Sequence, residues 1–281
     1  MNKSFIKSPL NYIGGKYKIL SQIIPLFPKR ISTFIDLFGG GCNIAVNVKA
    51  DTVIYNDLNI KVVQILETFK KNTVEDMLSY IDSLINMYRL SKDNIEGFLK
   101  IRTNYNTSVE KNPLMLYTII CYAFNNQIRF NSKGEYNLPF GKNRSSFNDV
   151  LRKKFIEFCA AIQSENILFT NSDFREYDDI KFDTDTFIYC DPPYLNSTAT
   201  YNEKNGWTTQ DEEDLRKLFD KLNFQKVKWA LSNNLKTNTD LFNWANDHSY
   251  TIKYINNSYK NCNYHKKDKS NKDVEVLIVN Y

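Results

Sequence analysis

Short apolar runs separated by turn residues recur in the first and last parts of the chain. Runs of this length bounded by Gly, Pro, Asn or Asp are typical of buried strands. The predicted strands are residues 31–37, 52–55, 166–170, 186–190, 227–232, 251–255 and 274–279. Helix-like apolar spacing separates most of them, over residues 43–48, 155–163 and 209–222. This alternation predicts a parallel sheet with helices on both faces.

Two details refine this pattern towards the C-terminus. Thr209 is followed three positions later by Glu212, which predicts a capping box at the start of the helix 209–222. Only an Asn- and Lys-rich stretch separates the runs 251–255 and 274–279, so we expect an antiparallel hairpin at the sheet edge. Within that stretch, residues 260–272 are polar and basic and are predicted to form a loop.

The middle of the chain has a different pattern. Helical apolar spacing predominates there, over residues 60–71, 74–87, 93–103 and 113–124. The stretch RFNSKGEYNLPFGK, residues 129–142, contains Gly and Asn at turn-like positions and predicts a loop or short hairpin. We therefore expect a mainly helical insertion between two parts of an α/β core.

Composition places the chain among cytosolic globular proteins. The 281 residues are enough for one core and an insertion, and the apolar and charged fractions, 42% and 25%, are ordinary. No apolar run is long enough to span a bilayer, and the N-terminus lacks a signal-peptide pattern, so we expect a cytoplasmic location without membrane contact. Five scattered cysteines without a CxxC pair indicate buried free thiols, with no metal site.

The net charge of +5 is concentrated in the middle of the chain. Residues 58–158 hold 15 Lys and Arg against 10 Asp and Glu, whereas the remainder is balanced at 22 of each. Between residues 126 and 154 seven basic side chains face only Glu135 and Asp149. Such an excess can hold a polyanion, although a solvated surface with a chance bias explains the charge equally well.

A glycine-rich turn follows the first predicted strand in FIDLFGGGCNIAVNV, residues 34–48. Glycines at a strand-to-helix turn let a ligand approach the backbone, and Asp57, about 20 residues further on, can bind ribose hydroxyls. Asp36 at the strand end suits a ligand that carries an amine or a cation. The pattern indicates a nucleoside-containing cofactor, while a turn without ligand and a nicotinamide site both stay open.

The sequence TFIYCDPPYLN carries a more specific signal, because an apolar strand runs directly into Asp191, Pro192, Pro193 and Tyr194. The prolines fix the backbone in a rigid, extended course. A rigid loop alone would explain the prolines but not the flanking acid and aromatic residue.

This tetrapeptide suits methylation of the adenine amine, a poor nucleophile whose lone pair is delocalised into the ring. The Asp191 carboxylate and the Pro192 carbonyl could accept hydrogen bonds from its two N–H groups. These contacts would favour the more tetrahedral amine that attacks the methyl group. Tyr194 could stack on a base extruded from the duplex. Such a reaction needs neither a metal ion nor a covalent intermediate.

The sequence resembles the Dam-like (D12 class) N6-adenine DNA methyltransferases along nearly its whole length. The motifs that carry the resemblance, in the family's order, are PLNYIGGKYKIL, FIDLFGGG, YNDLN, RFNSKGEYNLPFG, DPPY, KWALSNN and VEVLIVNY. RFNSKGEYNLPFG is the most family-specific, because it resembles the segment with which Dam-like enzymes contact DNA. Cys42 stands where the family shows Gly or Ser, which is a departure in the glycine motif.

The resemblance, taken with these patterns, implies three sets of site residues. The catalytic residues are Asp191, Pro192, Pro193 and Tyr194. The residues that bind S-adenosylmethionine are Tyr12, Lys16, Asp36, Phe38, Gly39, Gly40, Gly41, Asp57, Asp173 and Asp191. The DNA-binding residues are Arg129, Asn131, Lys133, Pro139, Lys142 and Arg144. Two alternatives stay open: Asp173 as a helix N-cap, and Arg129 as a phosphate contact or internal ion pair instead of a base reader.

The sequence thus predicts a Rossmann-like methyltransferase core, residues 1–57 and 159–281, with a mostly parallel sheet, and a helical DNA-recognition insertion, residues 58–158. The expected activity is methylation of adenine in a specific double-stranded DNA site, with GATC favoured by the resemblance and a restriction endonuclease as a genetic partner. Rival interpretations are a methyltransferase for cytosine N4 or other amines and amides, a catalytically silent DNA-binding relative, and a nicotinamide oxidoreductase. Two features argue against the oxidoreductase: the DPPY segment, and the lack of an obvious acid for hydride transfer, since the only histidines in the sequence are His248 and His265.

Overall fold

The computed structural model describes residues 5–195, 206–236, 238, 240–256 and 274–281. The chain divides into two compact units, which we describe separately. The first unit consists of Met1–Gly15, Gly40–Asn47 and Asn59–Asn171. The second consists of Lys16–Gly39, Val48–Leu58 and Ser172–Tyr281. Both units are therefore assembled from segments that are far apart in the sequence. The predicted boundary between core and insertion stays a prediction.

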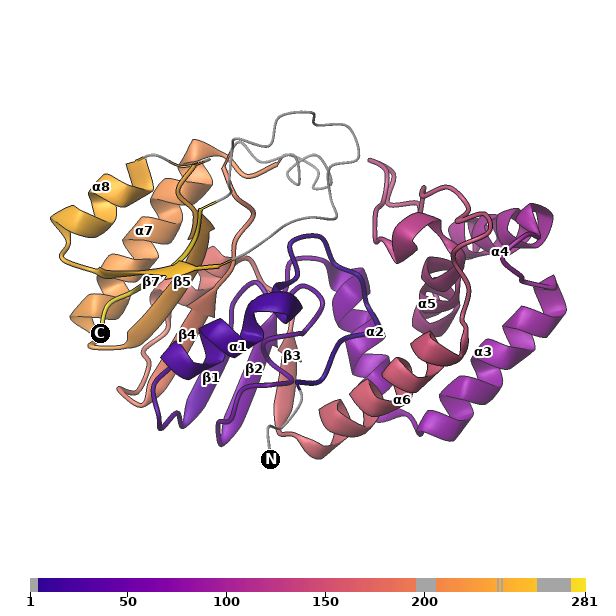
Figure 1. Cartoon of the computed structure of the whole chain (residues 1–281), viewed down its shortest axis with the longest axis horizontal. Coiled ribbons are helices and arrows are strands. Elements are labelled where there is room, and N and C mark those ends of the chain that lie inside the picture. Colours follow the sequence, from indigo (N-terminus) through magenta and orange to yellow (C-terminus); the bar gives the residue numbers. More distant parts are fainter. Residues whose placement is uncertain (1–4, 196–205, 237, 239, 257–273) are drawn as a thin grey trace. The chain divides into compact units, whose positions relative to one another are not determined.

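The second unit is built on a mostly parallel sheet (Figure 1). Its strands are β1 (Thr33–Asp36), β2 (Thr52–Asn56), β4 (Thr186–Cys190), β5 (Lys228–Asn234), β6 (Thr251–Ile255) and β7 (Glu275–Val279). Their order is β2-β1-β4-β5-β7-β6. β7 runs antiparallel to β6, as the sequence predicted for the C-terminal hairpin, and it also runs antiparallel to β5. The parallel strands therefore all end at one edge, and β7 begins there.

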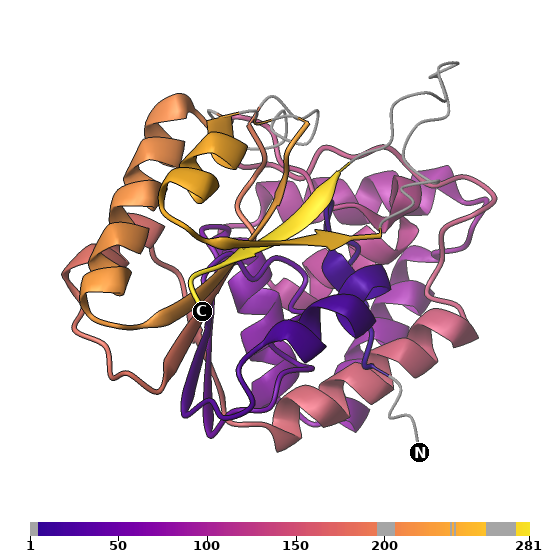
Figure 2. The same ribbon diagram turned by 60° about the vertical axis from the view of Figure 1, so that its left-hand side comes forward.

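Helical segments cover both faces of this sheet (Figure 2). On one face α7 (Thr209–Phe224), α8 (Asp240–Asp247) and η4 (Phe174–Asp179) pack on a hydrophobic core in which Phe219 stacks on Trp229 at 4.1 Å. On the other face η1 (Lys16–Ile19), α1 (Leu20–Ile23) and η2 (Ile24–Leu26) lead to Phe27, whose ring contacts Phe187 at 4.9 Å. The predicted α/β class with a mostly parallel sheet is confirmed.

The first unit is mainly helical, as predicted for the middle of the chain. Its elements are α2 (Ile60–Lys71), α3 (Val74–Tyr88), α4 (Ile95–Thr107), α5 (Pro113–Tyr122), η3 (Phe124–Asn126), α6 (Asp149–Ser164) and β3 (Ile167–Thr170). Five of these helices begin at a side chain that accepts a backbone N–H, which is the preferred way to satisfy a helix start. The capping residues are Asn59, Thr73, Asn94, Asn112 and Asn148. The core of the unit includes an aromatic cluster, with Phe69, Tyr117 and Phe155 in mutual contact.

The stretch 129–142 forms short bridged turns, as predicted. Phe130 pairs with Tyr136 and Ala123 pairs with Phe140 as antiparallel bridges. The turn between the first pair is held by Asn131, whose backbone N–H donates to the Glu135 carbonyl. Gly134 adopts φ +76° in this turn, a conformation that glycine reaches at little cost.

Three sequence predictions need correction. Residues 43–48 do not form a helix: residues 43–47 form turns, which directly follow Cys42 with its left-handed φ of +61°. The capping box of α7 lies one residue earlier than predicted, with Thr208 and Asp211 in place of Thr209 and Glu212. The helix predicted over 155–163 begins at Asp149, since its polar first turns lack apolar spacing but are capped by Asn148.

Four cysteines are buried free thiols, as predicted: Cys42, Cys121, Cys159 and Cys190. Cys262, His265 and the predicted loop 260–272 lie outside the described residues. Among the helices in the described ranges, none combines the length and apolar character that crossing a bilayer requires.

Candidate active site

The carboxyl ends of β1 and β2 hold the first group of predicted cofactor residues. Asp36 ends β1 and is 1% exposed, and Asp57 follows β2 and is 8% exposed. The Asn56 side chain donates to the carbonyls of Leu37 (3.1 Å) and Ser172 (3.0 Å) and accepts the Ser172 N–H. Asn56 therefore fixes the ends of both strands and the segment before η4 against one another.

Gly39 has a packing reason that is independent of any ligand. Its N–H donates to the Asn56 carbonyl at 2.7 Å. A Cβ at this position would lie 2.2 Å from the Tyr55 ring, far inside van der Waals contact. The neighbouring Phe38 packs on Phe174 at 5.5 Å and on Trp207 at 5.7 Å. The backbone thus approaches the sheet closely at this turn, and an aromatic cluster lies beside it.

The other predicted residues of the glycine motif belong to the first unit. Gly40 adopts φ +48°, and a Cβ there would lie 3.1 Å from the Tyr12 ring. Gly41 is similarly close to the Leu10 carbonyl and to Asn43. The Asn43 side chain in turn accepts the Ser8 N–H at 3.1 Å, which ties the N-terminal segment to this turn. Tyr12, Gly40 and Gly41 are therefore neighbours, and their contact with a cofactor stays a prediction.

Asp173 is the N-cap of η4. Its carboxylate accepts the Arg175 N–H at 2.9 Å and forms a capping box with Glu176. It also pairs with the Arg175 guanidinium, which in addition binds Asp211 and Asp214 of α7. The alternative left open by the sequence, a capping role, is thus present, and a contact with the cofactor stays a prediction.

The DPPY tetrapeptide, predicted to be catalytic, follows β4, a strand whose five residues are all buried. The Asp191 side chain is 16% exposed, and its Oδ1 lies 2.7 Å from the Nζ of Lys16. The Tyr194 hydroxyl lies 3.2 Å from the same oxygen. The Lys16 ammonium is also 4.9 Å from the centre of the Tyr194 ring, within reach of a cation–π interaction. Lys16, 4% exposed, is therefore part of the site and not a surface lysine.

Glu275, the first residue of β7, completes this network and was missed by the sequence reasoning. Its Oε1 accepts the Tyr194 hydroxyl at 2.8 Å and lies 3.5 Å from the Lys16 Nζ. The side chain is fully buried. The sequence did contain a signal, because Glu275 is the one charged residue in the apolar run VEVLIV. This run was predicted to be a strand of an antiparallel hairpin. Such a strand begins at the edge where the parallel strands end.

These contacts set the acidity of Asp191. Burial raises the pKa of its carboxyl to about 6, because it disfavours the charged form. The Lys16 ammonium acts against this rise, and the Glu275 carboxylate adds to it. At neutral pH Asp191 is an ionised acceptor that is more basic than an ordinary aspartate.

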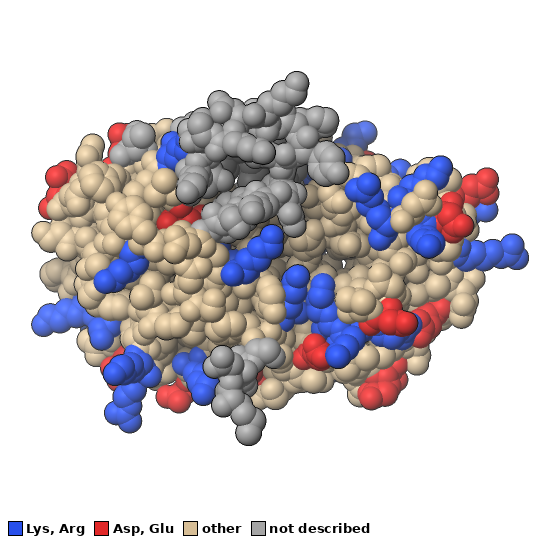
Figure 3. Space-filling view, in the orientation of Figure 1, with Lys and Arg blue, Asp and Glu red and all other residues tan. Residues whose placement is uncertain are grey.

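The candidate DNA-binding residues lie in the first unit, where Lys and Arg side chains gather on the face shown in Figure 3 above α4 and α5. Lys133, Pro139, Lys142 and Arg144 are exposed. The half-buried Arg129 donates its Nε to the Asn137 Oδ1 at 2.9 Å.

Asn131 has a structural role in the same segment. Its Oδ1 accepts the N–H groups of Lys133 and Glu135, and its Nδ2 donates to the Glu135 carboxylate. This side chain holds the turn in shape, and its contact with DNA stays a prediction.

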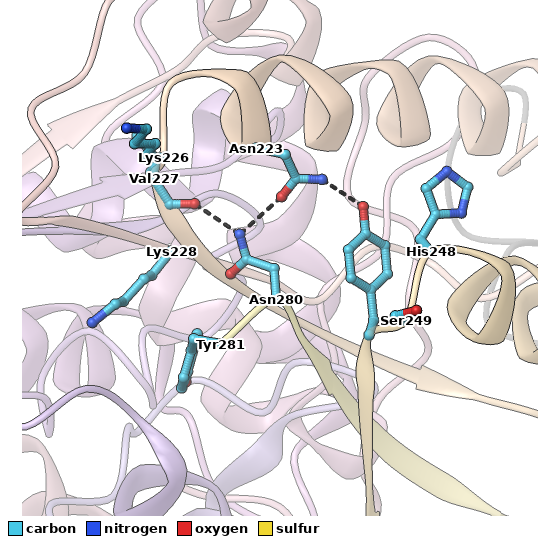
Figure 4. Close-up of a pocket in the computed structure, with 9 residues that line it drawn as sticks. Asn223, Lys226, Val227, Lys228, His248, Ser249, Asn280 and Tyr281 are labelled. Atoms are coloured by element: carbon cyan, nitrogen blue, oxygen red, sulfur yellow. Dashed lines mark hydrogen bonds between the residues drawn. The ribbon is translucent and has the colours of Figure 1, made fainter.

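A separate surface pocket lies away from all predicted residues (Figure 4). Lys228, which lines it, pairs with Phe187 near the start of β4, whereas Asp191 follows the end of that strand. The Asn280 amide in this pocket donates to Asn223 and to the Val227 carbonyl, so these groups satisfy one another. The pocket therefore belongs to the opposite end of the sheet from the tetrapeptide.

Comparison with known proteins identifies relatives of the whole chain. The model of the D12 class N6 adenine-specific DNA methyltransferase family matches residues 12–272. Type II methyltransferase M.FokI of Planomicrobium okeanokoites is 44% identical, over 99% of this chain and 43% of the relative. Modification methylase StsI of Streptococcus sanguinis is 41% identical over the same shares. Type II methyltransferase M.MjaIII of Methanocaldococcus jannaschii is 28% identical, over 98% of this chain and 99% of the relative.

The chain thus spans less than half the length of M.FokI and StsI and nearly the whole of M.MjaIII. The matched residues include Lys16, the glycine turn and the DPPY tetrapeptide. The resemblance seen in the sequence is confirmed, and the protein belongs to the D12 class N6 adenine-specific DNA methyltransferase family.

Proposed function

We propose that the protein transfers a methyl group from S-adenosylmethionine to the N6 amine of adenine in double-stranded DNA. The observation that carries this proposal is the buried β4 strand ending in Asp191, Pro192, Pro193 and Tyr194, with Lys16 bound to the acid. Membership of the family supports the same reaction.

The Asp191 carboxylate and the Pro192 carbonyl would accept hydrogen bonds from the two N–H groups of the adenine amine. Lys16 and Tyr194 both contact Oδ1 of Asp191, so we assign the amine to the other oxygen, Oδ2. Each acceptor binds more strongly as positive charge develops on the attacking nitrogen, which is the condition for lowering the barrier. The raised pKa of Asp191 also favours it as the group that takes the proton which the amine loses.

The methyl donor would bind at the strand ends. Asp57 would accept hydrogen bonds from the ribose hydroxyls, and Asp36 would face the amine-bearing end of the donor. The buried position of both acids fits a ligand that replaces water at these carboxylates. The remaining donor-binding assignments of the sequence prediction are kept: Tyr12, Lys16, Phe38, Gly39, Gly40, Gly41, Asp173 and Asp191.

The first unit would bind DNA through its basic side chains. Lys133, Lys142 and Arg144 are exposed and suit phosphate contacts, whereas Arg129 is held in one orientation by Asn137 and suits a base edge. The target adenine would leave the stack and lie against Tyr194. Following the family resemblance, we propose a short specific site that contains GATC.

Several of the relatives carry the names of type II methyltransferases or modification methylases. We therefore propose that the protein acts in the cytoplasm on the cell's DNA and protects it from a partner restriction endonuclease.

The test is transfer of tritiated methyl groups from S-adenosylmethionine to DNA by the purified protein and by Asp191→Ala and Asp191→Asn. We expect transfer by the parent, none by the alanine variant and severe impairment of the asparagine variant, which keeps the shape but loses the charge. Asp247→Ala, which removes an exposed acid in α8, is the matched control. Near-parental turnover by Asp191→Ala would refute the mechanism.

A further inference from the structure

Glu275 is a buried charge for which the proposed reaction has so far given no role. It is fully buried, and its Oε1 contacts the Tyr194 hydroxyl at 2.8 Å and the Lys16 ammonium at 3.5 Å. A glutamate inside a strand of otherwise apolar residues costs free energy unless it is paired. Both partners of Glu275 also contact Asp191. The buried glutamate is therefore linked to the proposed catalytic residues, whereas an apolar residue would suit the sheet itself.

The topology explains how a residue so distant in sequence reaches the site. β4 and β5 are parallel and end at the same edge, while β7 runs antiparallel to β5 and starts there, with Glu275 opposite Asn234. The backbone of Glu275 is held on both sides, because it also pairs with Ile255 of β6. The carboxylate is therefore carried by a rigid, interior strand.

We propose that Glu275 is a positioning residue for methyl transfer, which fixes Tyr194 and Lys16 in the orientation that presents Asp191 to the adenine amine. This inference rests on the proposed function. Glu275 acts only through its neighbours and does not touch the reacting atoms.

The geometry indicates how the positioning works. Tyr194 has one hydroxyl proton, and the shorter contact, to Glu275, is the one that the proton serves, in preference to Asp191 at 3.2 Å. The ring against which the base would stack is thereby anchored at its far end. Lys16 lies between two carboxylates, closer to Asp191 at 2.7 Å than to Glu275 at 3.5 Å.

The electrostatic consequence follows from the groups that face Asp191. The described residues that act on its pKa are Lys16 from η1, Glu275 from β7 and Tyr194 from its own loop. Glu275 raises the pKa of Asp191, so its removal should lower that pKa and leave the acid ionised at a lower pH.

The first test compares Glu275→Gln with the parent in the pH dependence of kcat. Glutamine keeps an acceptor for Tyr194 but loses the charge, so the acid limb of the profile should move to lower pH by about half a unit or more. Glu213→Gln, an exposed residue of α7, is the matched control and should leave the limb in place. An unchanged limb in Glu275→Gln would overturn the proposal.

The second test uses Glu275→Ala, which also removes the anchor of Tyr194. We expect kcat to fall by about tenfold to a hundredfold, while the KM for S-adenosylmethionine changes by less than about threefold. Parental kcat in this variant would overturn the proposal.

A measurement without turnover keeps this inference separate from the proposed function. The Asp191 carboxyl can be titrated by carbon-13 NMR in the parent and in Glu275→Gln. A lower pKa in the variant supports the assigned contact whether or not the parent methylates DNA, and an identical pKa overturns it. Absence of methyl transfer by the parent would instead count against the proposed function.

Discussion

Replacement of Lys16 by methionine should be one of the most destabilising single substitutions in the second unit. The Lys16 side chain is 4% exposed and lies between Asp191 and Glu275, which are 16% and 0% exposed. Methionine has a similar volume, so the main effect is the loss of the charge that pairs two buried carboxylates. Breaking a buried ion pair by removing one partner costs about 3 to 5 kcal/mol, and we expect a loss in this range at pH 8.

The loss of stability should be smaller at lower pH, because Asp191 is then protonated and no longer needs the Lys16 charge. The pKa of Asp191 in the folded parent is about 6, above its ordinary value of 3.8, and Lys16 acts against this rise. Without Lys16 the pKa rises further. An acid whose folded pKa is raised destabilises the folded state when ionised, and the penalty disappears as pH falls through that pKa. Each further unit is worth about 1.4 kcal/mol, so the loss at pH 5.5 should be smaller by at least about that amount.

Urea denaturation at pH 8 and pH 5.5 provides the measurement, with the double variant Lys16→Met, Glu275→Gln as the internal control. The double variant leaves only one of the two carboxylates and should recover about 1 kcal/mol or more of the stability lost at pH 8. A loss below about 1 kcal/mol at pH 8, or one that does not depend on pH, would refute the view that Lys16 is held between two buried acids.

Three further predictions concern other residues. Asp57→Ala should weaken S-adenosylmethionine binding by about 1 to 3 kcal/mol in calorimetric titration; equal affinity would give the acid a structural role. Arg129→Ala should cost about 1 to 3 kcal/mol and relax selectivity at one position in a panel of singly substituted duplexes; a uniform fall in all rates would assign the residue to phosphate contact. Gly39→Ala should cost about 1 to 3 kcal/mol in urea denaturation because its Cβ would meet the Tyr55 ring at 2.2 Å; parental stability would show that the ring moves aside.

The strands and most helices could be predicted from the spacing of apolar residues alone. Each element buries one apolar face, and that face repeats with the period of a strand or a helix. The helix α2 was predicted with both ends correct, since Asn59 caps it and Lys71 ends its apolar pattern. The turns after Cys42 were not, because a left-handed residue other than glycine leaves no mark in an apolar pattern. Local geometry of this kind depends on partners such as Asn47, whose side chain contacts Ile6 from the N-terminal segment.

The site divides in the same way. Asp191 and Tyr194 could be recognised from the sequence because the residues proposed to act together in DPPY are consecutive in the chain. Glu275 and Asn56 were not, since each acts on residues far along the chain, which only the strand order brings near. The antiparallel direction of the last strand was predicted, so the position of Glu275 at the edge where the parallel strands end could have been deduced from it.

We propose that Asp191 directs a methyl group to the N6 amine of adenine. The most direct measurement is to incubate DNA with the protein and S-adenosylmethionine, digest it to nucleosides and identify the methylated product by mass spectrometry, with Asp191→Ala in parallel. We expect N6-methyldeoxyadenosine from the parent, confined on long-read mapping to one short sequence, and none from the variant. N4-methyldeoxycytidine as the product, or equal yields of N6-methyldeoxyadenosine from parent and variant, would contradict it.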